Sequence, residues 1–100
     1  MKFEKIDDSL TEVTTPFLDL RNDYLQVFIE DDKVTDKGFL LEELELSGMK
    51  SFYLEKLLKT YGFKIENKEI RKTIIDKESD LVGLFTILMV VSNEIRYKEK

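Results

Sequence analysis

Three aspartates in the first third of this chain are the side chains best placed for chemistry. Asp19, Asp23 and Asp36 each lie beside an expected strand end or turn, where side chains from different strands can converge. Mg²⁺ needs only one or two carboxylates, because it keeps most of its waters. Aspartate is also favoured in turns, where it accepts backbone N–H bonds. The three residues therefore predict either a magnesium-dependent, nucleic-acid-processing enzyme or ordinary turn structure, and we favour turn structure.

The residue types that are missing narrow the possible chemistry further. The chain contains no histidine and no cysteine, which excludes a Ser-His-Asp triad, a cysteine nucleophile and an ordinary structural zinc site. Its four glycines do not form the phosphate-binding patterns G-x-G-x-x-G or G-x-x-x-x-G-K. We therefore expect no catalytic residue, no cofactor and no resident metal, and interpret the protein as non-enzymatic.

Length and composition predict one domain that spans residues 1–100. Hydrophobic residues make up 42% of the chain, charged residues 37%, and the net charge is −5. An acidic chain is poorly suited to neutralising phosphates, so we expect no direct nucleic-acid binding. The N-terminal segment is too charged for a signal peptide, and the apolar stretch 81–91 spans only about 16 Å as a helix, roughly half a bilayer core. We expect a cytoplasmic protein with no membrane span.

The first forty residues are expected to form a helix and then a hairpin. Apolar residues recur at helical spacing between residues 3 and 13, which predicts a short helix that ends before Pro16. Residues 24–30 are rich in β-branched and aromatic types and predict a strand. Asp31-Asp32 then predicts a tight turn into a second strand, and Gly38 is expected to adopt a positive φ.

The middle of the chain is expected to form two helices and a second hairpin. Leucines at helical spacing predict a short helix that ends at Gly48. A broad apolar stripe over 52–61 predicts a firmer helix, with Gly62 as its C-terminal cap. Asn67-Lys68 then predicts the turn of the second hairpin.

A long apolar helix is expected at the C-terminal end. It begins at a cap formed by Asp76 or Ser79 and runs toward Tyr97. Strands and helices are segregated along the chain and do not strictly alternate. The predicted class is therefore α+β: a small antiparallel sheet of two hairpins, with helices packed on one face.

The C-terminal helix carries more apolar surface than one side of a sheet requires. Over residues 81–91 it is apolar almost all round, so either neighbouring helices or another chain must cover it. If another chain covers it, Leu84 and Leu88 are candidate interface residues. The protein is then a homodimeric structural subunit.

A second candidate interface is acidic. Glu42, Glu43 and Glu45 lie together in the short helix that ends at Gly48. They either imitate the phosphates of a nucleic acid and block the protein that binds it, or form a solvated face. We favour the solvated face, because lysines are interleaved through much of the chain and the net charge is modest.

Several short motifs stand in a recognisable order. Thr15-Pro16-Phe17-Leu18-Asp19 comes first, Asn22-Asp23-Tyr24 then enters a strand, and Thr35-Asp36-x-Gly38, Leu44-x-Leu46-Ser47-Gly48 and Tyr61-Gly62 follow. By these motifs the chain resembles the bacterial and phage family named domain of unknown function 1828. The positions that look family-defining are Pro16, Phe17, Asp19, Asp23, Tyr24, Asp36 and Gly38.

The resemblance implies a small α+β module of bacterial genomes, prophages and mobile elements, here without the second domain that follows it in some proteins. The family has no agreed catalytic residues. The chain departs from the family pattern at Leu20, where we expect arginine and Arg21 comes one place later, and in the short hairpin before Thr35.

Our leading hypothesis is a non-enzymatic protein–protein interaction module of a prophage or mobile element. Its size, acidity, missing catalytic residue types and surplus apolar helix surface favour this function. A narrower version is a small acidic inhibitor of a host nuclease or defence complex, similar in role to anti-CRISPR proteins. The alternatives are the magnesium-dependent enzyme and the homodimeric subunit.

Overall fold

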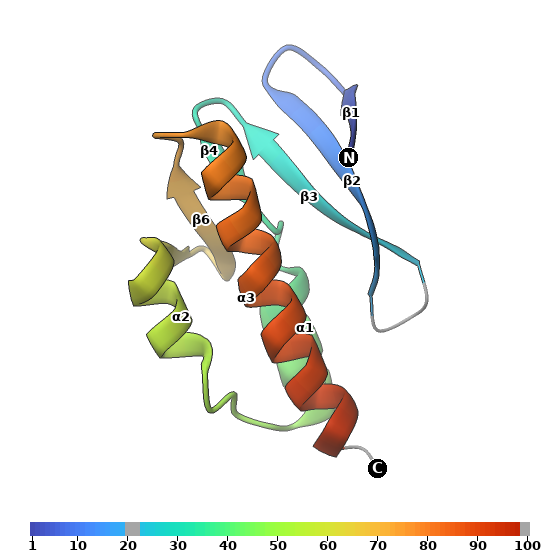
Figure 1. Ribbon diagram of the computed structural model, residues 1–100, viewed down its shortest axis with the longest axis vertical. Coiled ribbons are helices and arrows are strands. Elements are labelled where there is room, and N and C mark those ends of the chain that lie inside the picture. Colours follow the sequence, from blue (N-terminus) through green and yellow to red (C-terminus); the bar gives the residue numbers. More distant parts are fainter. Residues whose placement is uncertain (20–22, 99–100) are drawn as a thin grey trace.

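An antiparallel sheet and a long C-terminal helix form the framework of the protein (Figure 1). The computed structural model describes residues 1–19 and 23–98. In these residues the elements are β1 (Lys2–Lys5), β2 (Leu10–Leu18), β3 (Tyr24–Glu30), β4 (Lys33–Thr35), α1 (Phe39–Ser47), α2 (Leu54–Tyr61), β5 (Lys64–Glu66), β6 (Glu69–Thr73) and α3 (Lys77–Lys98). The predicted α+β class is confirmed.

The sheet contains both predicted hairpins and two further strands, β1 and β2, that were not predicted. Its strand order is β1-β2-β3-β4-β6-β5, and every neighbouring pair is antiparallel. The hairpins β3–β4 and β5–β6 turn at the expected places, with Asn67 and Lys68 at φ values of 52° and 63°. They join through β4 and β6, where Val34 lies opposite Lys72.

The helix predicted over residues 3–13 is wrong, because this segment forms most of β1, a turn and the first part of β2. The backbone N–H of Ser9 donates to Asp7 Oδ1 at 2.8 Å, and this local bond favours a turn over a helix. Val13 is fully buried opposite Val27 of β3. The helical spacing of four apolar residues along the chain gave no indication of this strand pairing. Pro16 lies inside β2, where the pairing with β3 shifts register between Thr14 and Leu18.

The two faces of the sheet differ in chemistry because side chains alternate along each strand. The valines at 13, 27 and 34 point to the core with Ile70, whereas Gln26, Glu30 and Arg71 lie on the opposite, polar face. The long helix α3 packs on the core face and contacts both α1 and α2 (Figure 1). The helices contribute most of the core through Leu40, Leu44, Leu81, Leu84, Phe85, Ile87, Leu88, Val91 and Ile95.

The ends of the helices show the features that were predicted at Gly38, Gly62 and Asp76. Gly38 precedes α1 with a φ of 85°, and Gly62 ends α2 with a φ of 78°, so both glycines have the left-handed backbone that was expected. Of the two residues proposed to cap the last helix, Asp76 fills the role: its Oδ1 accepts the N–H of Ser79 at 3.3 Å. Helix α2 is shorter than predicted, and no residue in it is fully buried.

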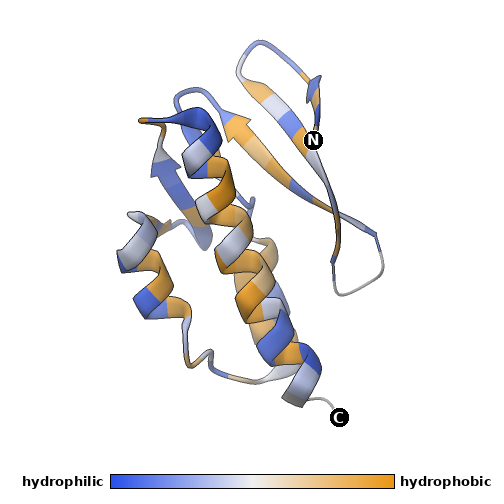
Figure 2. Ribbon diagram, in the orientation of Figure 1, coloured by the Kyte–Doolittle hydropathy of each residue, from blue (hydrophilic) through white to orange (hydrophobic). Residues whose placement is uncertain are grey.

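Among the described residues, none of the helices has the length and apolar character needed to cross a membrane. Polar residues at both ends of α3 limit its apolar part to the middle of the helix (Figure 2). The expectation of no membrane-spanning helix is therefore met in this part of the chain.

Candidate functional site

The three aspartates singled out in the sequence line one hollow, of about 610 Å³, beside the start of α1. Asp19 and Asp23 bracket the chain between β2 and β3, and the N–H of Asp23 donates to Asp19 Oδ1 at 3.0 Å. The other lining residues include Tyr24, Phe28, Phe39, Lys37 and Glu42. Leu20, Arg21 and Asn22, where the family motif was also considered, lie outside the described residues.

Asp36 is committed to backbone contacts within the chain. Its side chain is almost fully buried, and its two oxygens accept three backbone N–H bonds. Oδ1 accepts from Gly38 at 2.9 Å and from Ile70 at 3.0 Å, while Oδ2 accepts from Leu40 at 3.0 Å. One carboxylate thus holds the first turn of α1 against β6, which gives Asp36 a structural role.

Burial raises the pKa of Asp36 above its ordinary value, since the charged form is poorly solvated there. The three backbone N–H donors oppose this effect by stabilising the carboxylate. A hydrated Mg²⁺ would have to compete with these three N–H donors for the oxygens of Asp36. Across the described residues, no group of three or more acidic side chains is arranged to hold a metal ion.

Gly38 is required by backbone conformation and by space. At its φ of 85° a side chain is strained, and an added Cβ would lie 3.3 Å from the carbonyl oxygen of Lys68. Asp36 and Gly38 together shape the turn from β4 into α1. The structure thus gives both residues a role in backbone geometry.

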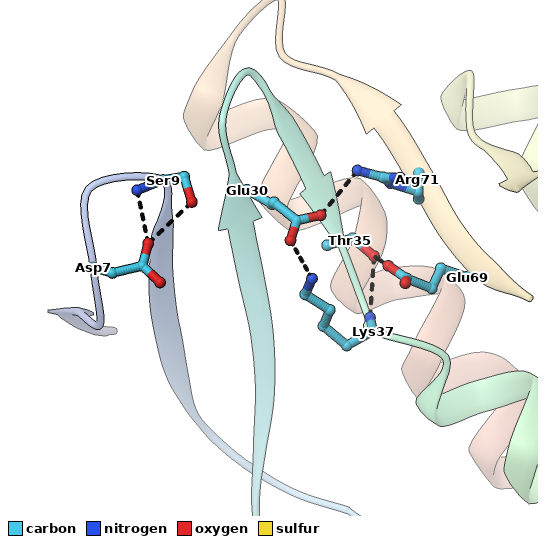
Figure 3. Close-up of polar contacts among 7 residues, drawn as sticks. All are labelled: Asp7, Ser9, Glu30, Thr35, Lys37, Glu69 and Arg71. Carbon is cyan, nitrogen blue, oxygen red and sulfur yellow. Dashed lines mark hydrogen bonds and ion pairs between the residues drawn. The ribbon is translucent and has the colours of Figure 1, made fainter. Parts of the chain in front are cut away.

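The polar face of the sheet carries a second cluster, in which each charge meets an opposite charge or a hydroxyl (Figure 3). Glu30 accepts hydrogen bonds from Lys37 and, at 3.0 Å, from Arg71. The Lys37 hydrogen bond is the main reason that the pKa of Glu30 lies below its ordinary value. Beside them Thr35 donates to Glu69 at 2.7 Å. These contacts join β3, β4 and β6, so the cluster acts as a clamp across the strands.

Asp80 forms a buried ion pair at the start of α3 that sequence reasoning missed. Its Oδ1 lies 2.8 Å from Lys72 Nζ, and its Oδ2 accepts the N–H groups of Ile75 and Asp76. Burial favours the neutral acid, but the Lys72 ammonium and the two N–H donors outweigh it and hold the pKa of Asp80 below its ordinary value. The contact anchors α3 to β6.

An apolar groove of about 540 Å³ runs along α3 beside the end of β2. Among its described lining residues only Thr86 is polar, and the Thr86 hydroxyl donates to the carbonyl of Val82 at 2.8 Å. Val82 is 51% exposed and Phe17 46% exposed. The remaining lining residues are Met1, Pro16, Phe85, Met89 and Val90. Contiguous exposed apolar surface of this kind marks sites of association.

The candidate interface residues of α3 are corrected by this placement. Leu84 and Leu88 are fully buried in the core, because the sheet, α1 and α2 cover that side of the helix. Val82, Met89 and Val90 occupy the outer side instead. A helical projection of α3 divides its residues into two stripes. The sequence alone does not indicate which of the two stripes faces the core.

The remaining candidate residues fall at separate places. Pro16 and Phe17 line the groove, and Tyr24 lies 61% exposed in the hollow. Glu42 also lines the hollow, and Glu45 is exposed elsewhere on α1. Glu43 is half-buried. The acidic residues therefore do not form one continuous face.

Comparison with known proteins identifies a family without an assigned activity. Residues 15–84 match the family model described as Domain of unknown function DUF1828. No curated protein and no solved structure matches the chain. The matched segment begins before Pro16 and includes Asp36, Gly38 and Val82, so it contains most of the hollow and part of the groove. Because the match covers well over half of the 100 residues, this chain belongs to the family of domain of unknown function DUF1828.

Proposed function

We propose that this protein is a non-enzymatic protein-binding module whose groove accepts an apolar helix of a partner protein. The observation that carries the proposal is the groove along α3, where Val82 and Phe17 are about half exposed although both are large and apolar. Burying these side chains against a partner would remove apolar surface from water, which is the main driving force of association.

The chemistry of the groove favours a helix as the bound segment. The one polar side chain among its described lining residues, Thr86, already donates to a carbonyl of its own helix. An extended peptide would bring backbone N–H and C=O groups into a surface that offers them no partners. A helix satisfies those groups internally and presents only side chains.

The state of the carboxylates supports the non-enzymatic part of the proposal. Asp36 is one of the three residues of the magnesium-enzyme alternative, and its oxygens are already bonded to three backbone N–H groups. Asp19 and Asp23 bond to each other across the chain between β2 and β3. No specific observation favours the enzyme over the binding module.

In its narrower form, we propose that the module belongs to a prophage or mobile element and inhibits a host nuclease or defence complex. The net charge of −5 and the exposed Glu42 and Glu45 of α1 support attraction to a basic partner. Attraction of this kind weakens as salt screens it.

Affinity capture with matched variants tests the proposal. Tagged wild type, Val82→Glu and Glu55→Gln are used as baits in lysate of the organism that encodes the chain, and bound proteins are quantified by mass spectrometry. Glu55 is an exposed residue of α2 away from the groove, so Glu55→Gln controls for surface change. We expect a stoichiometric partner that Val82→Glu reduces at least about tenfold, because a charge would enter an apolar contact.

Equal capture by Val82→Glu and by wild type would refute binding through the groove. For the narrower form, capture at low and high salt is compared between wild type and the triple variant Glu42→Gln, Glu43→Gln, Glu45→Gln. Salt-insensitive capture that the triple variant retains would refute the acidic inhibitor.

A further inference from the structure

We propose that the helix bound in the groove is α3 of a second copy of this chain, paired antiparallel about a two-fold axis at Thr86. The inference rests on the proposed function and names its partner. It uses the outer stripe of α3, defined as Glu78, Val82, Thr86, Met89, Val90 and Arg96.

The burial pattern along α3 separates the outer stripe from the core. Residues 83–85, 87, 88, 91, 92 and 95 are buried, whereas the stripe residues are half-buried or exposed. Positions three and four apart share one side of a helix, so Val82, Thr86, Met89 and Val90 form one continuous surface.

The apolar part of the stripe is self-complementary. Val82 and Val90 lie four residues before and after Thr86, about 6 Å along the helix on either side. A two-fold axis at Thr86 with antiparallel helices therefore places Val82 of each copy opposite Val90 of the other. A two-fold interface requires this reciprocity, in which one residue contacts a second and the second contacts the first.

The charges at the two ends of the stripe select the antiparallel direction. Glu78 lies in the first turn of α3 and Arg96 near its end, and both are exposed. An antiparallel pair places Glu78 of one copy near Arg96 of the other, twice by symmetry. A parallel pair would instead set Glu78 against Glu78 and Arg96 against Arg96. Antiparallel helix dipoles favour the same direction.

Arg96 can take part without leaving its present contact. One of its N–H groups donates to the carbonyl of Asp19 at 2.6 Å, and a guanidinium carries five N–H donors. Phe17 and Met1 stand beside the helix in the groove wall and would extend the contact beyond the two helices. This added area matters because a stable dimer buries roughly 800 Å² on each partner.

A charge exchange between two variants tests the pairing. Sedimentation velocity measures the dimer dissociation constant of the wild type, Glu78→Arg, Arg96→Glu and an equimolar mixture of the two variants. Glu55→Arg is the control, because Glu55 is likewise an exposed acid in the first turn of a helix but lies outside the groove. Circular dichroism and thermal melting verify that each variant is folded.

We expect a wild-type dimer that each single variant weakens about tenfold, since two opposite-charge contacts become like-charge contacts. The mixture restores dimerisation, because the arginine introduced at position 78 of one variant then meets the glutamate introduced at position 96 of the other, while the native Glu78–Arg96 pair forms at the second contact. Glu55→Arg leaves the dissociation constant unchanged. A wild type that stays monomeric at its highest soluble concentration overturns the inference, as does a mixture that dimerises no better than either variant alone.

This outcome separates the inference from the function on which it rests. A monomeric wild type that captures another protein through Val82 would overturn self-pairing and leave the binding module standing. A monomeric wild type with no capture that depends on Val82 would overturn both.

Discussion

The hollow beside α1 and the groove along α3 are similar in volume, about 610 and 540 Å³, but opposite in chemistry. In the hollow, Asp36 uses its hydrogen-bonding capacity on three backbone N–H groups of the same chain. In the groove, Val82 and Phe17 keep about half of their apolar surface in water. The comparison shows that the most conspicuous chemical residues can build the scaffold while plain apolar residues remain available to a partner.

The largest effect is expected from truncating the two sides of α3. Leu84→Ala should lower the free energy of unfolding by about 2–5 kcal/mol, because Leu84 is fully buried. Val82→Ala should lower it by less than about 1 kcal/mol, because Val82 is 51% exposed. Urea denaturation, at a protein concentration low enough to keep the chain monomeric, measures both losses in the free energy of unfolding. Similar losses at the two positions would mean that α3 has no distinct outer side.

A smaller effect is expected from Asp36→Asn, which addresses the hollow. The amide retains one oxygen for Gly38 and Ile70 but turns an NH₂ group toward the N–H of Leu40, so one buried donor loses its acceptor. The expected loss is about 1–3 kcal/mol in the free energy of unfolding. Asp8→Asn at an exposed position serves as the control. Wild-type stability in Asp36→Asn would mean that the carboxylate is free, which would reopen the metal-site interpretation.

The smallest effect concerns Asp80, whose lowered pKa makes its contribution depend on pH. The folded state favours the ionised form, so the contribution is complete above the ordinary aspartate pKa and is lost as pH falls through the lower, folded value. Asp80→Asn should therefore cost about 1–2 kcal/mol at neutral pH and progressively less in acid. Denaturant titrations from neutral to strongly acidic pH measure the difference between variant and wild type.

Asp36 should act in the opposite sense in the same titrations. Its pKa is raised by burial, so its ionisation reduces stability as pH rises from the ordinary aspartate value through the folded one. The role of the Asp80–Lys72 ion pair would be refuted if the free energies of unfolding of Asp80→Asn and wild type differed by the same amount at every pH. The two aspartates thus extend the comparison to the interior of the protein.

Local features of the fold were predictable because their causes lie within a few residues. The strand at Tyr24–Glu30, the turn at Asn67-Lys68, the positive φ of Gly38 and the cap at Gly62 follow from β-propensity and from the backbone angles that these residues allow. The helix expected over residues 3–13 was wrong because pairing of β2 with β3 overrode a weak helical spacing. The hollow was partly predictable, since the three aspartates lie beside strand ends or turns where side chains can converge.

The sequence by itself determined the α+β class, the hairpins β3–β4 and β5–β6, the C-terminal helix and the absence of histidine and cysteine chemistry. Only the tertiary structure decided which side of α3 faces the core and therefore that Val82, and not Leu84, is open to a partner. It also decided that Asp36 would bind the N–H of Ile70, 34 residues further along the chain. The physical reason is the same in both cases: burial and long-range hydrogen bonds depend on which elements meet in space, and local sequence does not specify that meeting.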